Sequence, residues 1–420
     1  MINYKIETTD ENLTSQSGLL QYGELLHRLG LKQIIDEQFP KQTRGESGSE
    51  YILPLLLMYT GGGKRLSDIR QIYHDGIHCS CKIINKKMDE DTLGKWLKRK
   101  GTFGGVQFLK ELSLSTVSKA TKQSKNLTLD VDAYFNASEK YSATIGHKGK
   151  GFYPLATHIS GGYITDLEFR LGNASPREGL LEAIQRTVAG LKKGIISLIR
   201  MDSAGYQSKI FNYCEEQDFS FVIAAQQNRT VIAVLDQIPE KEWKDYGDEY
   251  QIASSIHCME KTKKSFRIVG LRKKVEQLSF DEEGSAESKY KIVIATNASH
   301  SDKAILKFYR QRGHHSENCI KEMKQGFGFD YLPFADHFAG NDFVMQIQSL
   351  AYNLFLLMKQ IVLPSNFKKH LVSTVRWKFF FQAGKLVKHG RQYVFKVKQS
   401  FVELFLYCKA KINQIRPIFT

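Results

Sequence analysis

Cysteine and long apolar runs are scarce in this sequence of 420 residues, and each scarcity argues against a class of protein. The cysteines are few and scattered, at positions 79, 81, 214, 258, 319 and 408, so we expect no disulfide framework and a reducing compartment. The longest apolar runs, residues 51–59 and 354–358, are too short to span a bilayer. No signal-peptide pattern opens the chain, and we therefore expect a cytoplasmic protein that does not insert into a membrane.

Acidic residues are outnumbered by basic ones, with 44 Asp and Glu against 60 Lys and Arg. The formal net charge is +16, and the sequence pI is about 9.3. An excess of this size on a long chain indicates a polyanionic partner. Nucleic acid is the first candidate, and an anionic membrane surface is the alternative. The length itself favours two or three domains over one compact core.

Four potential metal ligands lie close together at His74, His78, Cys79 and Cys81. Their Cys-x-Cys spacing is not that of a zinc finger, and no second pair of ligands follows. We therefore interpret them as ordinary core and surface residues, with a zinc site as the minor alternative.

The first 125 residues or so have a helical pattern. In residues 47–73, apolar side chains recur at helical spacing on both sides of Gly61–Gly63, which predicts a helix, a turn and a second helix. Proline is tolerated best in the first turn of a helix, so the first of these helices is expected to start close to Pro54.

Residues 88–101 predict an amphipathic helix with a basic face. Asp89 or Asp91 is the expected N-cap. The apolar face is formed by Leu93, Trp96 and Leu97, and the opposite face by Lys95, Lys98, Arg99 and Lys100. The basic face is a candidate DNA contact, and an ordinary solvated face is an equally open interpretation.

From about residue 126 the pattern changes to one typical of a mixed α/β fold. Strands are expected at residues 126–134, 151–160, 161–172 and 196–203, with a helix at 175–194. Further strand-like runs follow at 230–235, 251–259, 265–274 and 290–296, and then a helix capped by Ser301.

Four acidic residues in this part are candidate metal ligands. Asp130 and Asp132 are two positions apart on a predicted strand and so point to the same face. Asp202 ends a later apolar strand, and Glu317 lies on the late helix. Acids brought together by the fold would suit a two-metal site for phosphoryl transfer, because Mg²⁺ prefers oxygen ligands. Acids at strand ends are also common as caps and turn formers, so the spacing leaves both interpretations open.

Several stretches in the same order resemble the DDE transposases of bacterial insertion sequences, and the closest resemblance is to insertion-sequence family 1380. The stretches include LDVDAY, KGFYPLATHIS, RLGNASPREG, MDSAGYQS, ENCIKEMK and RWKFFFQAGKLVKHGRQYVF. The resemblance implies an α/β fold with an RNase H-like catalytic core at 126–228 and 297–360. A β-rich insertion at 229–296, a helical DNA-binding domain at 1–125 and a basic C-terminal region at 361–420 are expected around that core.

The same resemblance implies that Asp132, Asp202 and Glu317 form the catalytic triad and hold Mg²⁺ or Mn²⁺. Asp130 is the alternative for the first position and a further candidate metal ligand. Family members usually have Asp-x-Thr at the first acid, whereas this chain has Asp132-Ala133-Tyr134.

Residues around Glu317 resemble a transposase signature in which Tyr, Arg, Glu and Lys are separated by two, three and six residues. Tyr309, Arg312, Glu317 and Lys324 fit it, except that four residues separate Arg312 from Glu317. Arg310, Glu317 and Lys324 recur every seven residues and could share a helical stripe, with Lys321 one turn from the glutamate. These cations are expected to bind DNA phosphates around Glu317.

The expected function is that of a transposase which binds the terminal inverted repeats of its element, cuts the ends and joins them to target DNA. The implied partners are double-stranded DNA and, on that DNA, a second copy of the chain in a homodimer. A stand-alone nuclease and a catalytically inactive DNA-binding protein are the alternatives. Trp243 in the insertion is a candidate for stacking on an unpaired base, although packing in the core of the insertion is the favoured interpretation.

Overall fold

The computed structural model describes residues 2, 4–41, 45–274, 289–313, 317–390 and 392–419. The chain divides into two compact units, which we describe separately. The first unit comprises residues 1–116, 140–142 and 321–420, and the second comprises 117–139 and 143–320. Residues 321–360, which the sequence grouped with a catalytic core, therefore lie in the first unit.

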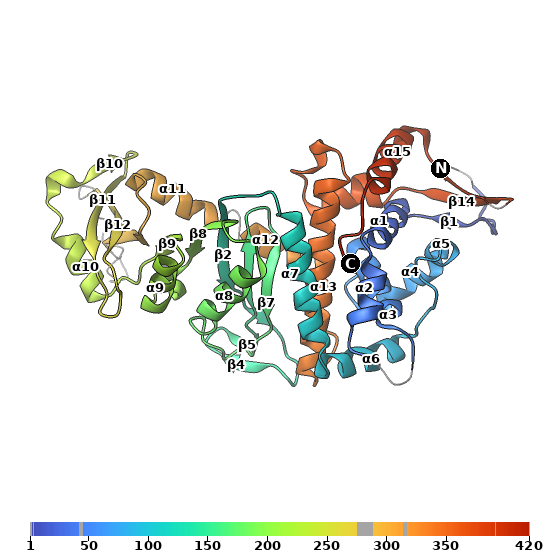
Figure 1. Ribbon diagram of the computed structural model, residues 1–420, viewed down its shortest axis with the longest axis horizontal. Coiled ribbons are helices and arrows are strands. Elements are labelled where there is room, and N and C mark those ends of the chain that lie inside the picture. The colour runs from blue at the N-terminus through green and yellow to red at the C-terminus, as the bar shows by residue number, and fades with distance from the viewer. Residues whose placement is uncertain are drawn as a thin grey trace. The chain divides into compact units, whose positions relative to one another are not determined.

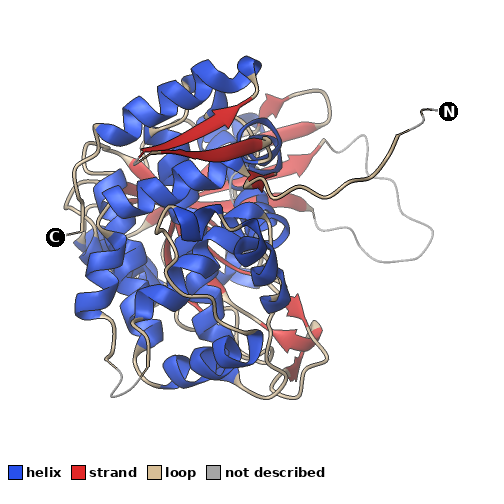
Figure 2. Ribbon diagram, turned by 90° about the vertical axis from the view of Figure 1, so that its right-hand side faces the viewer, coloured by secondary structure: helices blue, strands red, loops and turns tan. Residues whose placement is uncertain are grey.

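The first unit is mainly helical, as Figure 2 illustrates. Its helices are α1 (Ser17–Arg28), α2 (Leu31–Gln38), α3 (Gly48–Gly61), α4 (Ile69–Asp75), α5 (Ile77–Ser80), α6 (Glu90–Thr102), α13 (Phe338–Ile361), α14 (Val372–Val375) and α15 (Gln399–Asn413). Two more helices, α7 (Gly105–Ala120) and α12 (Asn318–Phe327), each contain a boundary between the units. The long helix α13 packs against α3 and α6 and provides much of the core of the first unit.

Local sequence explains several of these helix ends. Asp89 caps α6, because its side chain accepts a hydrogen bond from the backbone N–H of Thr92 at 2.8 Å. Gly62 ends α3 in the left-handed region at φ +100°, as the expected turn requires. The predicted helix start near Pro54 is wrong, because Pro54 lies in the middle of α3. Nearly every residue of α3 is buried, and this packing outweighs the roughly 3 kcal/mol that an interior proline costs.

The C-terminal residues complete the first unit by packing against its N-terminal helices. Helix α15 lies against α1, as Figure 1 shows. Strand β14 (Gly384–His389) pairs with β1 (Leu13–Thr14) on one side and with β15 (Gln392–Val397) on the other. The buried side chain of Arg376 donates hydrogen bonds to the backbone carbonyl groups of Tyr59, Thr60 and Gly326. Arg376, a basic residue of this C-terminal region, therefore has a structural role.

A mixed sheet of nine described strands forms the centre of the second unit, in the order β10-β11-β12-β13-β9-β8-β2-β6-β7. The strands are β2 (Leu127–Ala133), β6 (Leu155–Ile159), β7 (Ile164–Glu168), β8 (Ile196–Met201), β9 (Ser220–Ala224), β10 (Lys244–Tyr246), β11 (Tyr250–His257), β12 (Phe266–Lys273) and β13 (Tyr290–Thr296). Strands β2, β8 and β9 are parallel, and the other pairs are antiparallel. The predicted mixed α/β character is confirmed.

Helices and a small sheet connect these strands. Helix α8 (Leu180–Gly190) links β7 to β8, and α9 (Ser208–Glu216) links β8 to β9. Strands β3 (Asn136–Ala137), β4 (Thr144–Gly146) and β5 (Gly149–Phe152) form a separate antiparallel sheet between β2 and β6. The expected strands at 126–134, 196–203, 251–259, 265–274 and 290–296 are all present.

The expected strand at 230–235 is wrong, because these residues belong to helix α10 (Arg229–Asp236). The side chain of Asn228 accepts a hydrogen bond from the backbone N–H of Val231 at 3.0 Å and so caps the helix. Val231 and Leu235 are buried one helical turn apart, which gives α10 its packing face.

The β-rich stretch between β9 and helix α11 (Asp302–Arg312) extends the central sheet. Strand β13 pairs antiparallel with β9, so β10 to β13 continue the same hydrogen-bonded order. Figure 1 shows α11 alongside these strands, and Ile305 and Leu306 of α11 are buried against Ile252, Val269 and Ile294. This packing fixes α11 on the sheet and directs its C-terminal residues.

Among the described residues, no helix is both long enough and apolar enough to cross a membrane.

Candidate active site

The candidate active site lies where the neighbouring parallel strands β2 and β8 end. Their register places Asp130 beside Arg200 and Val131 beside Met201. Asp132 and Asp202 each follow the Asp130–Arg200 pair by two positions, so both lie one side-chain repeat farther along the same face. The Asp202 side chain also accepts a hydrogen bond from the backbone N–H of Ala204 at 2.9 Å. Two carboxylates therefore meet at one edge of the sheet.

Arg312, at the end of α11, joins these two carboxylates. Its Nη2 lies 2.9 Å from Oδ2 of Asp132 and 3.8 Å from Oδ2 of Asp202. The side chains of Asp132 and Arg312 are 15% and 16% exposed, whereas Asp202 is 44% exposed. Burial lowers the pKa of Arg312, but the charges of Asp132 and Asp202 more than offset this, and the pKa is raised overall. The single positive charge of Arg312 thus reduces the repulsion between the two acids but does not neutralise both.

Tyr309 lies one turn before Arg312 on α11. Burial is the main cause that raises the pKa of Tyr309, and the positive charge of the nearby Arg312 opposes this rise. The structure therefore brings four of the predicted site residues together: Tyr309, Arg312, Asp132 and Asp202.

Asp130 lies in a different environment from Asp132. Its two carboxylate oxygens accept hydrogen bonds from Nε and Nη2 of Arg200, at 2.7 and 2.8 Å. Both side chains of this ion pair are only 2% exposed. Arg200 also donates from Nη1 to the backbone carbonyl of Phe308 in α11, at 2.7 Å. Asp130 is thus committed to a buried ion pair that connects β2, β8 and α11.

Sequence reasoning did not identify Arg200, although a signal for it exists. The strands carry Asp-x-Asp at 130–132 and Arg-x-Asp at 200–202. An arginine inside an otherwise apolar strand needs a partner when it is buried, and Asp130 is the acid at the matching position.

Glu317 is exposed and lies between the end of α11 and the start of α12. A methyl group built on Gly313 would lie 3.6 Å from its Oε1, so the side chain lies close to that glycine. Within the described part of the chain, no group of three or more His, Cys, Asp or Glu residues is placed to hold a metal ion. The structure therefore does not cluster Glu317 with the two aspartates, nor does it form a zinc site from His74, His78, Cys79 and Cys81.

The expected stripe of Arg310, Glu317 and Lys324 is not carried by one regular α-helix, because α11 ends at Arg312 and α12 begins at Asn318. Arg310 instead lies over the ring of Tyr246 in β10, with its guanidinium carbon 5.4 Å from the ring centroid. Lys324 pairs with Asp330 at 3.5 Å, and Lys321 is exposed on α12.

Helix α6 presents part of its predicted basic face. Lys95 and Arg99 are exposed, whereas Lys98 pairs with Asp336 at 3.4 Å. Lys100 is buried and donates to the backbone carbonyl of Pro40 at 2.6 Å, so its expected place on the solvent face is wrong. On the apolar face, Trp96 stacks on Tyr51 with a centroid distance of 4.3 Å.

Trp243 is a core residue in this structure. Trp243 is 6% exposed, and the guanidinium carbon of Arg272 lies 4.1 Å from the centroid of its indole ring. The ring of Tyr290 stacks on the indole ring with a centroid distance of 6.0 Å. The indole ring is therefore covered, and stacking on a DNA base would require it to leave this packing.

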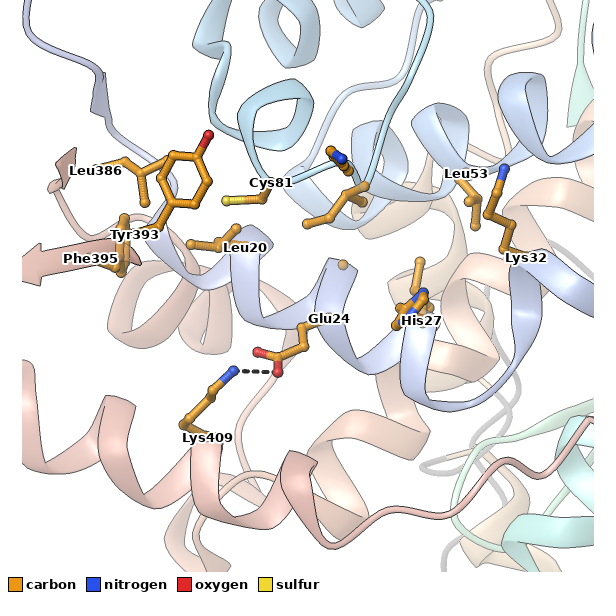
Figure 3. Close-up of a pocket in the computed structure, with 14 residues that line it drawn as sticks. Leu20, Glu24, His27, Lys32, Leu53, Cys81, Leu386, Tyr393, Phe395 and Lys409 are labelled. Carbon is orange, nitrogen blue, oxygen red and sulfur yellow. Dashed lines mark hydrogen bonds and ion pairs between the residues drawn. The ribbon is translucent and has the colours of Figure 1, made fainter. Parts of the chain in front are cut away.

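A separate cavity of about 550 Å³ belongs wholly to the first unit. Figure 3 shows Leu20, Leu53, Leu386 and Phe395 among its lining residues, with Glu24 paired to Lys409. Among the described residues that line it, Glu24 is the only carboxylate and is already neutralised. The cavity therefore lacks the acids that metal-dependent phosphoryl transfer requires.

Two carboxylates at adjacent strand ends, with a cation between them, agree with what comparison with known families finds. The family model described as Transposase DDE domain group 1 matches residues 3–417. The chain therefore belongs to this transposase family. No curated protein matches the chain. Membership indicates nuclease or transposase activity and DNA as the partner, and such domains generally use divalent metal ions.

Proposed function

We propose that the protein binds the terminal inverted repeats of an insertion sequence of the family 1380 type, cleaves the element's ends and joins them to target DNA. The observation that carries this proposal is the pair Asp132 and Asp202, held at neighbouring strand ends by Arg312. The excess of basic residues supports a DNA substrate. We further propose that β7-β6-β2-β8-β9 is the RNase H-like core and that two copies assemble on DNA.

The donor chemistry of the site fits a hard divalent cation such as Mg²⁺ or Mn²⁺. Asp132 and Asp202 would provide carboxylate oxygens, and Glu317 would approach from the segment after α11. A bound cation would supply Lewis-acid activation of the scissile phosphate and of the attacking oxygen. Asp130 would remain with Arg200, because its oxygens are already used.

The chain's own cations would position the DNA. Arg312 partly neutralises the two aspartates, and its planar N–H donors suit a phosphate oxygen as well as a carboxylate. Movement of Arg312 from carboxylate to phosphate would couple DNA binding to the release of ligands for the metal.

The test is a cleavage and strand-transfer assay on a duplex that ends in the inverted repeat flanking the gene. We expect cleavage and joining with Mg²⁺ or Mn²⁺, and binding without turnover with Ca²⁺, which prefers looser coordination. Full cleavage in chelator would contradict the metal mechanism. Cleavage without joining would favour the stand-alone nuclease, and binding without either reaction would favour an inactive DNA-binding protein.

We also propose that the exposed basic residues of α6, Lys95 and Arg99, take part in recognising the repeat. In the full chain, Lys95→Ala/Arg99→Ala should lower the preference for the repeat over a scrambled duplex by about tenfold, since a good base contact is worth about 1–3 kcal/mol. Competition binding at fixed salt measures this ratio. Lys369→Ala, which removes an exposed lysine elsewhere in the first unit, is the control. An unchanged ratio in the double variant would move sequence recognition away from α6.

A further inference from the structure

One tryptophan of the first unit lies on the surface, unlike the other two in the chain. The sequence contains three tryptophans, and all of them lie in the described residues. Trp96 and Trp243 are 1% and 6% exposed, whereas Trp377 is 74% exposed. Within the described part of the chain, the indole ring of Trp377 stacks on no other ring and forms no hydrogen bond. Since a large aromatic ring gains most from burial, its exposure here favours a role in binding.

Trp377 belongs to a helical segment whose other face is well packed. The segment consists of α14 and the π-helical turn Arg376–Phe380. The ring of Phe380 stacks on that of Phe355 with a centroid distance of 6.0 Å, and the ring of Phe379 stacks on that of Phe405 at 5.2 Å. The buried residues of the segment are Val372, Val375, Arg376, Phe379 and Phe380. The indole ring is therefore presented to solvent from a firmly held support.

The exposed face of this segment combines two aromatic rings with a lysine. Ser373, Trp377 and Phe381 recur every four residues, so they lie on neighbouring turns of one face. Phe381 is 41% exposed. Lys378 is also exposed, and its Nζ lies 3.2 Å from Nε2 of His370. We call Trp377, Lys378 and Phe381 the Trp377 surface.

The sequence around the Trp377 surface contains no acid. Residues 343–402 lack Asp and Glu, while lysine and arginine recur throughout the stretch. Glu322 does reach the segment, but its Oε1 accepts a hydrogen bond from the backbone N–H of the buried residue Val372 at 2.8 Å. The charge of this region therefore favours an anionic partner on the Trp377 surface.

Exposed aromatic rings beside a lysine suit a single strand of nucleic acid better than a duplex. In a duplex, the flat face of each base is covered by its neighbours in the stack, whereas a single strand leaves it accessible. Proteins that bind single strands stack aromatic side chains on the bases and hold the backbone with cations. Trp377 and Phe381 would provide the stacking rings, and Lys378 would provide the cation. Because every base has a flat face, such a contact tolerates any sequence.

We propose that the Trp377 surface binds a single-stranded segment of the DNA on which the protein acts. Unpaired bases arise wherever end cleavage or joining opens the duplex, so the inference rests on the proposed function for the identity of its ligand. The binding itself requires no catalysis. Trp377, in place of the covered Trp243, is then the ring that is available for base stacking.

The test measures binding of the full-length chain to a labelled oligothymidylate and to a duplex of equal length, in chelator so that no DNA is cut. Trp377→Ala should weaken the single-strand complex by about tenfold or more, the effect of losing one base–aromatic stack, and leave duplex binding nearly unchanged. Trp377→Phe keeps a ring and should retain most of the affinity. Tyr141→Ala, which removes a ring that is 87% exposed elsewhere in the first unit, is the control and should change neither complex. Equal melting temperatures of these variants show that folding is intact.

The fluorescence of the chain provides a second measurement. Because the other two tryptophans are buried, oligothymidylate should quench the emission of Trp377 alone. This quenching should vanish in Trp377→Phe while the labelled oligothymidylate still binds. Lys378→Ala should reduce the salt slope of single-strand binding by about 0.7, the value for one phosphate contact.

Several results would overturn the inference. Equal weakening of both complexes by Trp377→Ala would place the surface on duplex DNA, and unchanged single-strand affinity would show that the ring does not contact DNA. If single-strand affinity is unchanged while binding to vesicles containing phosphatidylserine or self-association in sedimentation is lost, the surface belongs to a membrane contact or to a second copy of the chain.

The same measurements separate this inference from the proposed function. If the chain binds oligothymidylate through Trp377 but never cleaves the element's ends, the proposed function fails and the single-strand site stands. If the chain cleaves and joins ends while Trp377→Ala leaves single-strand binding unchanged, the proposed function stands and the inference is wrong. Absence of any DNA binding would overturn both.

Discussion

Asp132→Asn is expected to abolish cleavage of the element's ends while leaving DNA binding intact. The substitution removes a charged carboxylate, the proposed metal ligand, from the edge where β2 and β8 end, but it removes no cation. Metal activation is worth several kcal/mol, which corresponds to a loss of about a thousandfold or more in rate. Cleavage of a labelled duplex in Mg²⁺ measures the loss, and binding in Ca²⁺ measures retention.

Folding of Asp132→Asn should be nearly normal, which makes the result interpretable. The Asp132–Arg312 pair is partly exposed, and its loss also removes repulsion between Asp132 and Asp202. The free energy of unfolding is expected to change by no more than about 1 kcal/mol. Asp202→Asn should behave in the same way.

Glu317→Gln tests the proposed third member of the triad, which the described part of the structure does not cluster with the two aspartates. A loss of cleavage as large as that of Asp132→Asn would support its role as a ligand. Normal cleavage by Glu317→Gln would require a different third acid. If Asp132→Asn still cuts, and a folded Asp130→Asn does not, the first position of the triad belongs to Asp130.

Much of this site could be predicted from sequence, because the positions of its residues follow from strand alternation and helical spacing. Alternation along β2 places Asp130 and Asp132 on one face, and a carboxylate directly after the apolar strand β8 lies at its end. Tyr309 and Arg312, three positions apart, share a face of α11, as helical spacing requires. Each of these inferences uses fewer than five neighbouring residues.

What sequence could not provide depends on contacts between distant segments. The separate roles of Asp130 and Asp132 follow from the register of β2 with β8, which places Arg200 beside the first and Asp202 near the second. Nothing local to the Asp-x-Asp pattern distinguishes the two acids. The spacing of Arg312 and Glu317 departs from the transposase signature by one residue, so sequence alone could not show that Arg312 lies next to both aspartates.

The errors in secondary structure have the same origin. Residues 230–235 have the composition of a strand, but the Asn228 cap and the burial of Val231 and Leu235 favour helix α10. Pro54 would usually mark a helix start, yet the burial of α3 retains it in mid-helix. Tertiary packing outweighs local preference in both cases.

The two acid–arginine sets near the ends of β2 and β8 differ in burial. The inner set, Asp130 with Arg200, is fully buried and bidentate, whereas the outer set, Asp132 and Asp202 with Arg312, reaches solvent through Asp202. Burial makes the inner set intolerant of change, because an unpaired charge there has no water to compensate it. Partial exposure leaves the outer set able to exchange one cation for another.

Asp130→Asn is therefore expected to destabilise the protein far more than Asp132→Asn does. The amide would leave the Arg200 guanidinium buried without its counter-charge, and breaking such a pair from one side costs about 3–5 kcal/mol. For a unit of this size, that corresponds to a fall in melting temperature of roughly 10 °C. Thermal unfolding followed by circular dichroism measures the shift, with Asp132→Asn as the matched control.

The double variant Asp130→Asn/Arg200→Met identifies the cause of that loss. Removing the stranded charge together with its partner should recover a large part of the stability, since replacing a buried pair with apolar groups is often nearly neutral. Recovery should be incomplete, because Arg200 also donates to the carbonyl of Phe308 and so holds α11 against the strands. That carbonyl would lose its donor, and Arg312 at the end of α11 would be held less firmly.

Cleavage per folded molecule should consequently fall in both Asp130→Asn and the double variant, but by less than in Asp132→Asn. A melting temperature of Asp130→Asn equal to that of the unaltered chain would show that the pair is not buried as described, and Asp130 would return as a candidate metal ligand.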